Sequence, residues 1–540
     1  MRLKQNHGCM NCIGLEKRVR ATGLPVLWML VVMTVVGGAA TLTACNDGDD
    51  DSTKQRPDNS AFIPKEQQPD DTLGIPNEAL TLESVLREEK YSPDEFLRHL
   101  GSPSMGAMLD TTEPLSSLGI NNLAHALASV KLGAHLPHLD SLFAAEVGTE
   151  ADGSRRWRFE SYTFTYKSVT SYGQSVVMSG RVTFPNNVVD GTGHEVSTLT
   201  LHSHQDLLFS DCAPSENLMF MPMRAMYNSA VIEPDFQHCG INNTKIADGT
   251  GSPKALTRQL VDCAIAALEV MHQHGVKLAP NGHTTNWGTS KNFAVPIGFA
   301  KYYETEAPQW LRDAIRLGAT FAGEGAFDLG ETMPYFFKYP EYYSVGLYFM
   351  CYVYGLTASQ LGGYGPTDIM SPWLASNIHH IGDKDYTLSD AISLGLIRVF
   401  TLEPDPRLPE ITSTDQILAP DVLTADGLMD ESNPKVQAIL RGLSEEGDVY
   451  DWVPTLPIYF AHCPFDRVLP YSDARQAYLR FSNQETNPAI HWIDVPYPEA
   501  LVESADQLHV VALHAFVSFF MHLYMSCVEE PADMAKIYRQ

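Results

Sequence analysis

The first part of the chain has apolar residues three and four positions apart. The stretches LTLESVLREEK and INNLAHALASVKLGAHL show this spacing most clearly. It is typical of amphipathic helices, in which such positions share one face. We therefore predict an N-terminal helical segment at 76–150 that braces the rest of the domain.

From Trp157 onward, apolar and polar residues alternate. RWRFESYTFTYKSVT and SVVMSGRVTFPNN follow this pattern, and Tyr172 and Gly173 stand between them. Period-two alternation on both sides of a turn residue is typical of a β-hairpin. We expect an antiparallel pair of strands here.

After the hairpin, short apolar runs alternate with longer helical patterns. STLTLHSH, SAVIEPDF, TTNW and AIRLGATFAGEG are predicted strands, with TTNW the weakest of them. PSENLMFMPMRAMYN, ALTRQLVDCAIAALEVMHQHG and NFAVPIGFAKYYE are predicted helices, and Pro296 falls near the first turn of the last. In the second helix one face is formed by Leu256, Leu260, Cys263, Ala264, Ala267 and Met271. This alternation predicts an α/β fold with a mainly parallel central sheet and helices on both faces.

A region rich in Tyr, Phe and Met follows this core. Residues 331–452 contain several short helical patterns, and strand patterns resume only at LPIYFAHC and IHWIDV, before the apolar helical pattern VVALHAFVSFFMHLYM. We predict a helical cap at 331–452, inserted between a first core part at 151–330 and a second at 453–540.

The N-terminus has the order of residues found in an export signal. Basic residues precede the apolar run LPVLWMLVVMTVVGGAATLTA, which ends at Cys45. The run is short for a spanning helix, and the LTAC at its end resembles the bacterial lipobox, in which a peptidase cuts before a lipid-modified cysteine. We expect a signal peptide at 1–44 and a lipid anchor on Cys45. The protein would then be an exported bacterial lipoprotein held on a membrane of the cell envelope, facing the periplasm or the cell surface. A plain signal peptide and an N-terminal membrane anchor are the alternatives.

Composition narrows the possible partners. Residues 45–75 are rich in Asp and Pro and nearly free of apolar residues, so we expect a disordered acidic tether. The chain has 37 Lys and Arg against 65 Asp and Glu, a net charge of −28, which repels nucleic acid and anionic lipid surfaces. Membrane contact would therefore come through the lipid anchor. Six cysteines after Cys45 stand in a compartment that permits disulfides, and their pairing stays open.

One short stretch has the residue types of a nucleophile on a tight turn. Gly288-Thr-Ser290-Lys-Asn292 lies between a predicted strand and a predicted helix and is close to the pattern G-x-S-x-G. A strand-turn-helix lifts such a serine above the sheet and directs a helix N-terminus at the reacting carbonyl. Asn292 replaces the second glycine. The alternative is that Ser290 caps the following helix.

A serine nucleophile needs a base and an acid, which follow it in the order acid, histidine in this type of fold. Asp466 comes just after the strand pattern of LPIYFAHC, and His509 precedes the last apolar helix. The order Ser290, Asp466, His509 therefore fits. Asp506 is the rival acid, and the rival histidines, both within the apolar helix, are His514 and His522.

Taken together, these stretches resemble the α/β-hydrolase superfamily, specifically exported bacterial esterases or lipases with a helical cap, similar to the secretory lipase branch. The resemblance spans about residues 155 to 525. It rests on SGRVTFP, LHSHQDLLFSDCAPSE, EPDF, NWGTSKN, AGEGAFDLGETMPYF, FAHCPFDRVLP and the late His509, in that order.

The resemblance implies a role for each site residue. Ser290 is the expected nucleophile, His509 the general base and then acid, and Asp466 the group that holds the histidine tautomer. The expected oxyanion hole is the N–H of Lys291 with that of Gln205 or Asp206, although LHSHQD departs from the His-Gly pattern usual in such loops. The implied reaction is ester hydrolysis through an acyl-enzyme, with no metal or organic cofactor.

The substrate and two alternative functions stay open. Aromatic and Met residues of the predicted cap favour a small-molecule or lipid-like ester with an apolar acyl or aryl group, unless they only pack the cap. A peptidase or amidase of the same fold is one alternative. The other is a ligand-binding surface lipoprotein without turnover, which Asn292 and the HSHQD loop favour. The pair His379-His380 has no second ligand pair at zinc spacing, so we expect no metal there.

Overall fold

The structure is a computed structural model. It describes residues 74–91, 158–170, 173–186, 194–203, 215, 229–237, 239–241, 252–289, 292–323, 325, 328–338, 363–364, 366–376, 413–462, 464, 469, 471–481 and 487–494. Of the predicted elements, the helices at PSENLMFMPMRAMYN, INNLAHALASVKLGAHL and VVALHAFVSFFMHLYM lie outside these residues.

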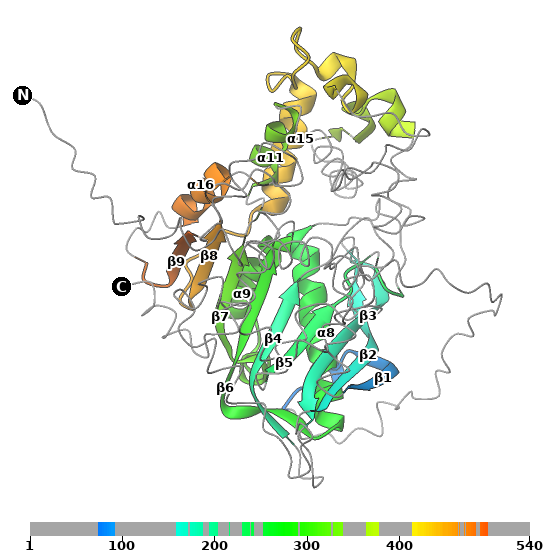
Figure 1. The fold of residues 1–540 in the computed structure, drawn as a ribbon, viewed down its shortest axis with the longest axis vertical. Helices are drawn as coiled ribbons and strands as arrows, with labels where there is room; N and C mark the ends of the chain where they lie inside the picture. Colours follow the sequence, from blue (N-terminus) through cyan, green and yellow to red (C-terminus); the bar gives the residue numbers. More distant parts are fainter. Residues whose placement is uncertain are drawn as a thin grey trace, which may run out of the picture.

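Nine strands form one sheet in the order β1-β2-β3-β5-β4-β6-β7-β8-β9 (Figure 1). β1 pairs antiparallel with β2, β2 with β3, and β3 with β5. All pairs from β5 to β9 are parallel. The strands are β1 Leu82–Tyr91, β2 Arg158–Val169, β3 Ser175–Asn186, β4 His194–Ser203, β5 Ser229–Pro234, β6 Val276–Thr289, β7 Leu317–Gly323, β8 Ile458–His462 and β9 Ile490–Asp494.

The predicted hairpin and the predicted strands of the core are confirmed. β2 and β3 pair over their whole lengths, and Gly173 between them has φ 74°, a backbone conformation that glycine adopts without strain. TTNW lies in the last part of β6. The sheet is mainly parallel, as the alternation of strand and helix patterns predicts.

The described helices are α8 Pro253–Gln273, α9 Ala294–Thr305, α10 Gln309–Ile315, α11 Leu329–Thr332, α15 Pro434–Gly447 and α16 Tyr471–Phe481. Short 3-10 turns are η4 Asn77–Ala79, η7 Met333–Phe337, η10 Pro366–Asp368, η11 Thr414–Gln416 and η12 Pro420–Val422. No helix in these stretches has the length and apolarity to cross a membrane.

Helices α8 and α9 cover the same face of the sheet and touch each other. All six residues predicted to share one face of α8 are buried. A Cβ on Gly298 of α9 would lie 2.5 Å from the hydroxyl of Thr257 on α8, so the two helices approach closely. Asn286 of β6 donates to the carbonyl of Pro296 and ties the sheet to α9 on this face. A helical layer on the opposite face stays a prediction.

The prediction of a helix at LTLESVLREEK is wrong, because residues 82–91 form strand β1. The register of β1 on β2 shifts twice, between Leu82 and Ser84 and between Val85 and Arg87. These irregularities break the alternation of a regular strand, so the apolar residues are spaced as in a helix. The carboxylate of Glu269 on α8 also accepts the backbone N–H of Thr81 at 2.9 Å, which fixes the start of the strand.

The described part of the predicted cap contains helices together with turns and two isolated β-bridges, and the cap as a unit stays a prediction. α11 and α15 pack together beyond one end of the strands (Figure 1). Asp328 caps α11 by accepting the N–H groups of Gly330 and Glu331, and Ser444 of α15 donates to the same carboxylate at 2.5 Å. α11 follows β7 directly and α15 precedes β8, so this part of the chain leaves and re-enters the sheet between those strands.

Candidate active site

The chain folds back tightly where β6 ends. A Cβ on Gly288 would lie 2.7 Å from the carbonyl oxygen of Asn292 and 2.8 Å from Cδ of Pro296. Both obstacles are rigid, so only glycine fits at this position. The requirement for a small residue before the serine is met, and buried Asn292 occupies the position where the pattern has its second glycine.

Ser290 and Lys291 lie between the described ends of this turn and are themselves outside the described residues. α9 begins at Ala294, and its N-cap position is held by Phe293, without a side-chain cap. Both interpretations of Ser290, as a nucleophile and as a capping residue of the following helix, therefore remain predictions from the sequence.

The other predicted site residues also fall outside the described part of the chain: Asp466, His509, Gln205, Asp206 and Cys45. The structure does describe the strand ends that precede three of the predicted site segments, those with Gln205 and Asp206, with Ser290 and with Asp466. β4 ends at Ser203, β6 at Thr289 and β8 at His462, and parallel pairing brings these carboxyl ends to one edge of the sheet. Ligands of open α/β sheets bind at this edge.

One to three residues before the carboxyl ends of the parallel strands, a row of side chains crosses all nine strands. Each member is the cross-strand partner of the next, except that Glu233 and His202 meet through a hydrogen bond of 2.8 Å. Cross-strand partners share one face of the sheet. In sheet order the row is Arg87, Thr163, Arg181, Glu233, His202, Trp287, Phe321, Tyr459 and His491.

The residues of the row on strands β6 to β9 all have aromatic rings. His202 stacks on Trp287 with ring centroids 4.8 Å apart, and Tyr459 stacks on Phe321 at 5.1 Å and on His491 at 4.6 Å. Trp287 is fully buried directly before Gly288. Stacked rings of this size form a rigid layer that reaches the residue before Gly288.

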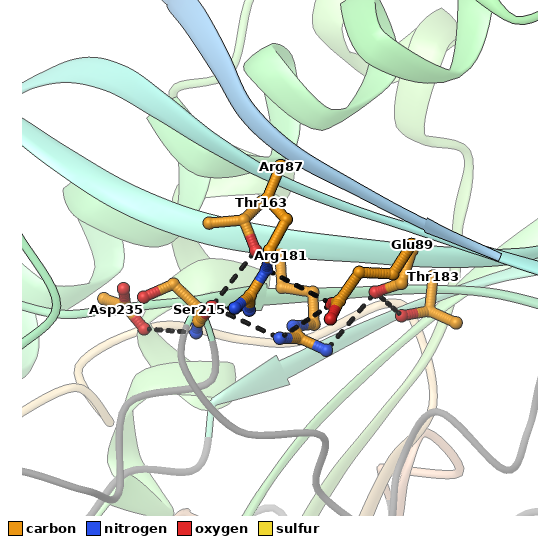
Figure 2. A network of polar contacts seen from close by, with 8 residues as sticks. Arg87, Glu89, Thr163, Arg181, Thr183, Ser215 and Asp235 are labelled. Atoms are coloured by element: carbon orange, nitrogen blue, oxygen red, sulfur yellow. Dashed lines mark hydrogen bonds and ion pairs between the residues drawn. The ribbon is translucent and has the colours of Figure 1, made fainter. Parts of the chain in front are cut away.

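The other half of the row, on β1, β2, β3 and β5, is mostly charged. Three of its side chains donate hydrogen bonds to the backbone of Ser215, which follows β4 in the chain. The carbonyl of Ser215 accepts hydrogen bonds from Arg87 at 2.8 Å, Thr163 at 3.1 Å and Arg181 at 3.2 Å (Figure 2). The N–H of Ser215 donates to buried Asp235 at 3.0 Å, and burial raises the pKa of that carboxyl.

At the centre of the row, a carboxyl group and an imidazole share a buried hydrogen bond. Glu233 and His202 are 1% and 2% exposed. Burial raises the pKa of Glu233 to about 8, and the charge of Arg181 opposes this rise. Near neutral pH, Glu233 therefore binds a proton in the folded protein that it releases in the unfolded chain.

We expect Glu233→Gln to flatten the pH dependence of stability. Between the ordinary pKa of 4.5 and the folded pKa of about 8, the folded state holds the extra proton, so the free energy of unfolding falls as pH rises. The slope is at most about 1.4 kcal/mol per pH unit. Urea unfolding of both proteins at pH 5, 6, 7 and 8 measures it, with the exposed Glu195→Gln as control. Parallel curves for Glu233→Gln and the wild type would contradict the assignment.

The residues of this row were not predicted from the sequence. Its motifs SGRVTFP, EPDF and LHSH contain Arg181, Glu233 and His202, but no role was assigned to them. The available signal was an ionisable residue inside each of three predicted strands, because such a group needs a partner when it is buried.

Comparison with solved structures supports the fold. The ligand-bound form of LipA, described as a rice cell wall degrading esterase from Xanthomonas oryzae, matches with a TM-score of 0.54 and 14% identity over 82% of this chain and 96% of its own. A protein of Legionella pneumophila that carries an assignment as a hydrolase matches with a TM-score of 0.52 and 18% identity, over 75% and 95% of the two chains. Scans against protein-family models and curated proteins found no match. At these identities the likeness is one of architecture, and the chain has the α/β-hydrolase fold.

Proposed function

We propose that this protein is a serine hydrolase of carboxylic esters, with Ser290 as its nucleophile. The observation that carries the proposal is the close approach at Gly288, which leaves no room for a side chain between the end of β6 and the start of α9. A turn this tight between a parallel strand and a helix is the setting that exposes a nucleophilic serine at the edge of the sheet. The esterase structure of the same fold supports ester chemistry.

In the proposed reaction, Ser290 attacks the ester carbonyl while His509 takes the hydroxyl proton. The tetrahedral intermediate then expels the alcohol, which receives that proton, and leaves an acyl group on Ser290. Water, activated by the same imidazole, releases the carboxylic acid and restores the serine. Asp466 orients the imidazole, and the N–H of Lys291 with that of Gln205 or Asp206 stabilises the oxyanion. The chemistry requires no cofactor.

The proposed substrate is a small or lipid-like ester, and the proposed location is the bacterial envelope with Cys45 as lipid anchor. Support for an apolar acyl or aryl group comes from the aromatic and Met residues of the predicted cap, since pockets for such groups are lined mainly by apolar side chains. Among these residues, Met333, Phe336 and Phe337 are buried within the protein.

Labelling with a fluorophosphonate probe tests the proposal, because this probe reacts with activated serines in strong preference to ordinary ones. The full-length protein is treated with the probe and the adduct is located by mass spectrometry, beside Ser290→Ala and His509→Ala. We expect labelling at Ser290 that disappears in both variants. A folded wild type without label would overturn the proposal and favour a ligand-binding role for the same scaffold.

A further inference from the structure

The start of α9 packs on the chain that leaves β7. A Cβ on Gly325 would lie 1.9 Å from Cγ of Phe293 and 2.2 and 2.5 Å from its two Cδ atoms. The phenyl ring therefore fills the space that a side chain at position 325 would need, so only glycine fits beneath it. Both residues are buried, and Phe293 is 1% exposed.

The pairing of β6 with β7 brings these two residues together. Thr289, the last residue of β6, is the register partner of Gly323, the last residue of β7. Phe293 and Gly325 follow these strand ends by four and two residues. Their contact therefore joins the two chain segments that leave neighbouring strands at the carboxyl edge of the sheet.

The chain beneath the ring is held on both of its sides. Gly325 comes directly after β7, and Asp328 then caps α11. The carboxylate of Asp328 also accepts the hydroxyl of Ser444 on α15. A Cβ on Gly330 would lie 2.1 Å from the carbonyl oxygen of Leu440, so α11 and α15 are tightly packed. The sheet and this helix pair bound the chain at Gly325, and close-packed contacts of this kind do not shift without cost.

On the other side of the contact, Phe293 belongs to the tight turn. It follows Asn292, whose carbonyl oxygen would lie 2.7 Å from a Cβ on Gly288. It also holds the N-cap position of α9, although a phenyl ring offers no acceptor for the free N–H groups of a helix. The side chain of Phe293 therefore contributes by packing, and Gly325 is the residue that it covers.

We propose that Phe293 is a positioning residue for the turn between β6 and α9, and that Gly325 provides the surface that fixes it. The ring, held over Gly325, sets the position of the Asn292 backbone against Gly288. The effect on turnover rests on the proposed function, in which the nucleophile belongs to this turn. A displacement of about 1 Å lowers turnover far more than substrate binding. In this role Phe293 acts through the backbone of the turn rather than on the substrate.

The test compares Phe293→Ala, Phe293→Leu, Gly325→Ala and the double variant Phe293→Ala/Gly325→Ala with the full-length wild type. Leucine keeps a Cγ and two Cδ atoms, the kinds of atom nearest Gly325, whereas alanine removes them. Gly180→Ala is the matched control, because a Cβ there would lie 2.7 Å from Sγ of Cys263, on strand β3, which β5 and β4 separate from β6. For each protein we measure kcat and KM for a p-nitrophenyl ester, the rate of inactivation by the fluorophosphonate probe, and the thermal unfolding midpoint.

We expect Phe293→Ala and Gly325→Ala each to lower kcat and the inactivation rate roughly 10- to 100-fold, with KM changed less than about threefold. Phe293→Leu stays within about threefold of the wild-type kcat. In the double variant, Gly325→Ala lowers kcat less than about threefold beyond Phe293→Ala, because no ring is left for the new methyl to displace. Gly180→Ala lowers the unfolding midpoint but leaves kcat near the wild-type value.

Three results would overturn the positioning role alone: a wild-type kcat in Phe293→Ala, an equal loss of kcat from Gly325→Ala with and without the ring, or a fall in kcat that Gly180→Ala reproduces at the same loss of stability. If Gly325→Ala fails to fold, the comparison of Phe293→Ala with Phe293→Leu decides. In each of these cases Ser290 of the wild type still reacts with the probe, and the proposed function stands. A wild-type protein that neither reacts with the probe nor hydrolyses esters overturns both.

Discussion

Ser290→Ala is expected to lower the hydrolysis of p-nitrophenyl esters by about 10³- to 10⁶-fold in kcat, with KM nearly unchanged. The substitution removes the atom that forms the acyl-enzyme but leaves the substrate pocket in place. The residual rate would come from oxyanion stabilisation and binding alone. Steady-state kinetics with esters of graded acyl length measure the effect and also show which acyl group the protein prefers.

The control for this experiment is Ser376→Ala. Ser376 is exposed, and its hydroxyl donates to the nearby carbonyl of Pro372. We expect wild-type kinetics for this variant and an unchanged circular dichroism spectrum for both. Substantial turnover by Ser290→Ala would show that another residue is the nucleophile and would remove the basis of the proposed mechanism.

Gly288→Ala is expected to lower kcat by about 10²-fold and to destabilise the protein by roughly 1–3 kcal/mol. The added methyl would stand 2.7 Å from a backbone carbonyl and 2.8 Å from a proline ring carbon, so the turn itself has to move. A displaced turn carries Ser290 away from its attack position. Kinetics and urea unfolding measure the two parts of the effect.

Gly447→Ala is the matched substitution away from the turn. A Cβ at Gly447, in the last turn of α15, meets no atom of the described residues within 4 Å. We expect unchanged kinetics and stability equal to or slightly above wild type, because alanine favours helix more than glycine does. Equal kinetics in Gly288→Ala and Gly447→Ala would mean that the tight turn has no part in turnover.

The sequence was sufficient to predict the order of the core elements, because each of them has a clear local pattern. Periodicity identified β2 to β9 and helices α8 and α9, and Gly288 was correctly interpreted as a position that needs a small residue. β1 was missed because its bulges give it a helix-like spacing and because Leu, Glu, Arg and Lys favour helices locally. Its pairing with β2 and the contact of Thr81 with Glu269 are long-range effects, absent from any short window of sequence.

The row of side chains could not be predicted from the sequence for a different reason. Arg181, Glu233 and His202 come from three separate strands, and only the sheet order and register make them neighbours. Along the sheet β5 lies between β3 and β4, so the order of the strands in space differs from their order in the chain. Residues that are neighbours in the row are therefore not neighbours in the sequence. A charge within a strand signals that a partner exists, but not which residue it is. The triad assignments remain predictions from motif order.

The irregular strand β1 has a consequence for how copies of this protein meet. It stands at one edge of the described sheet, where unpaired backbone groups invite another strand to add on. Its two register shifts bend that edge, and its charged side chains pair locally, as in Lys90 with Glu88 at 2.7 Å and Arg87 with Glu89 at 3.3 Å. A bent, charged edge is a poor template for strand addition, so this side of the sheet resists intermolecular aggregation even where many copies are crowded together.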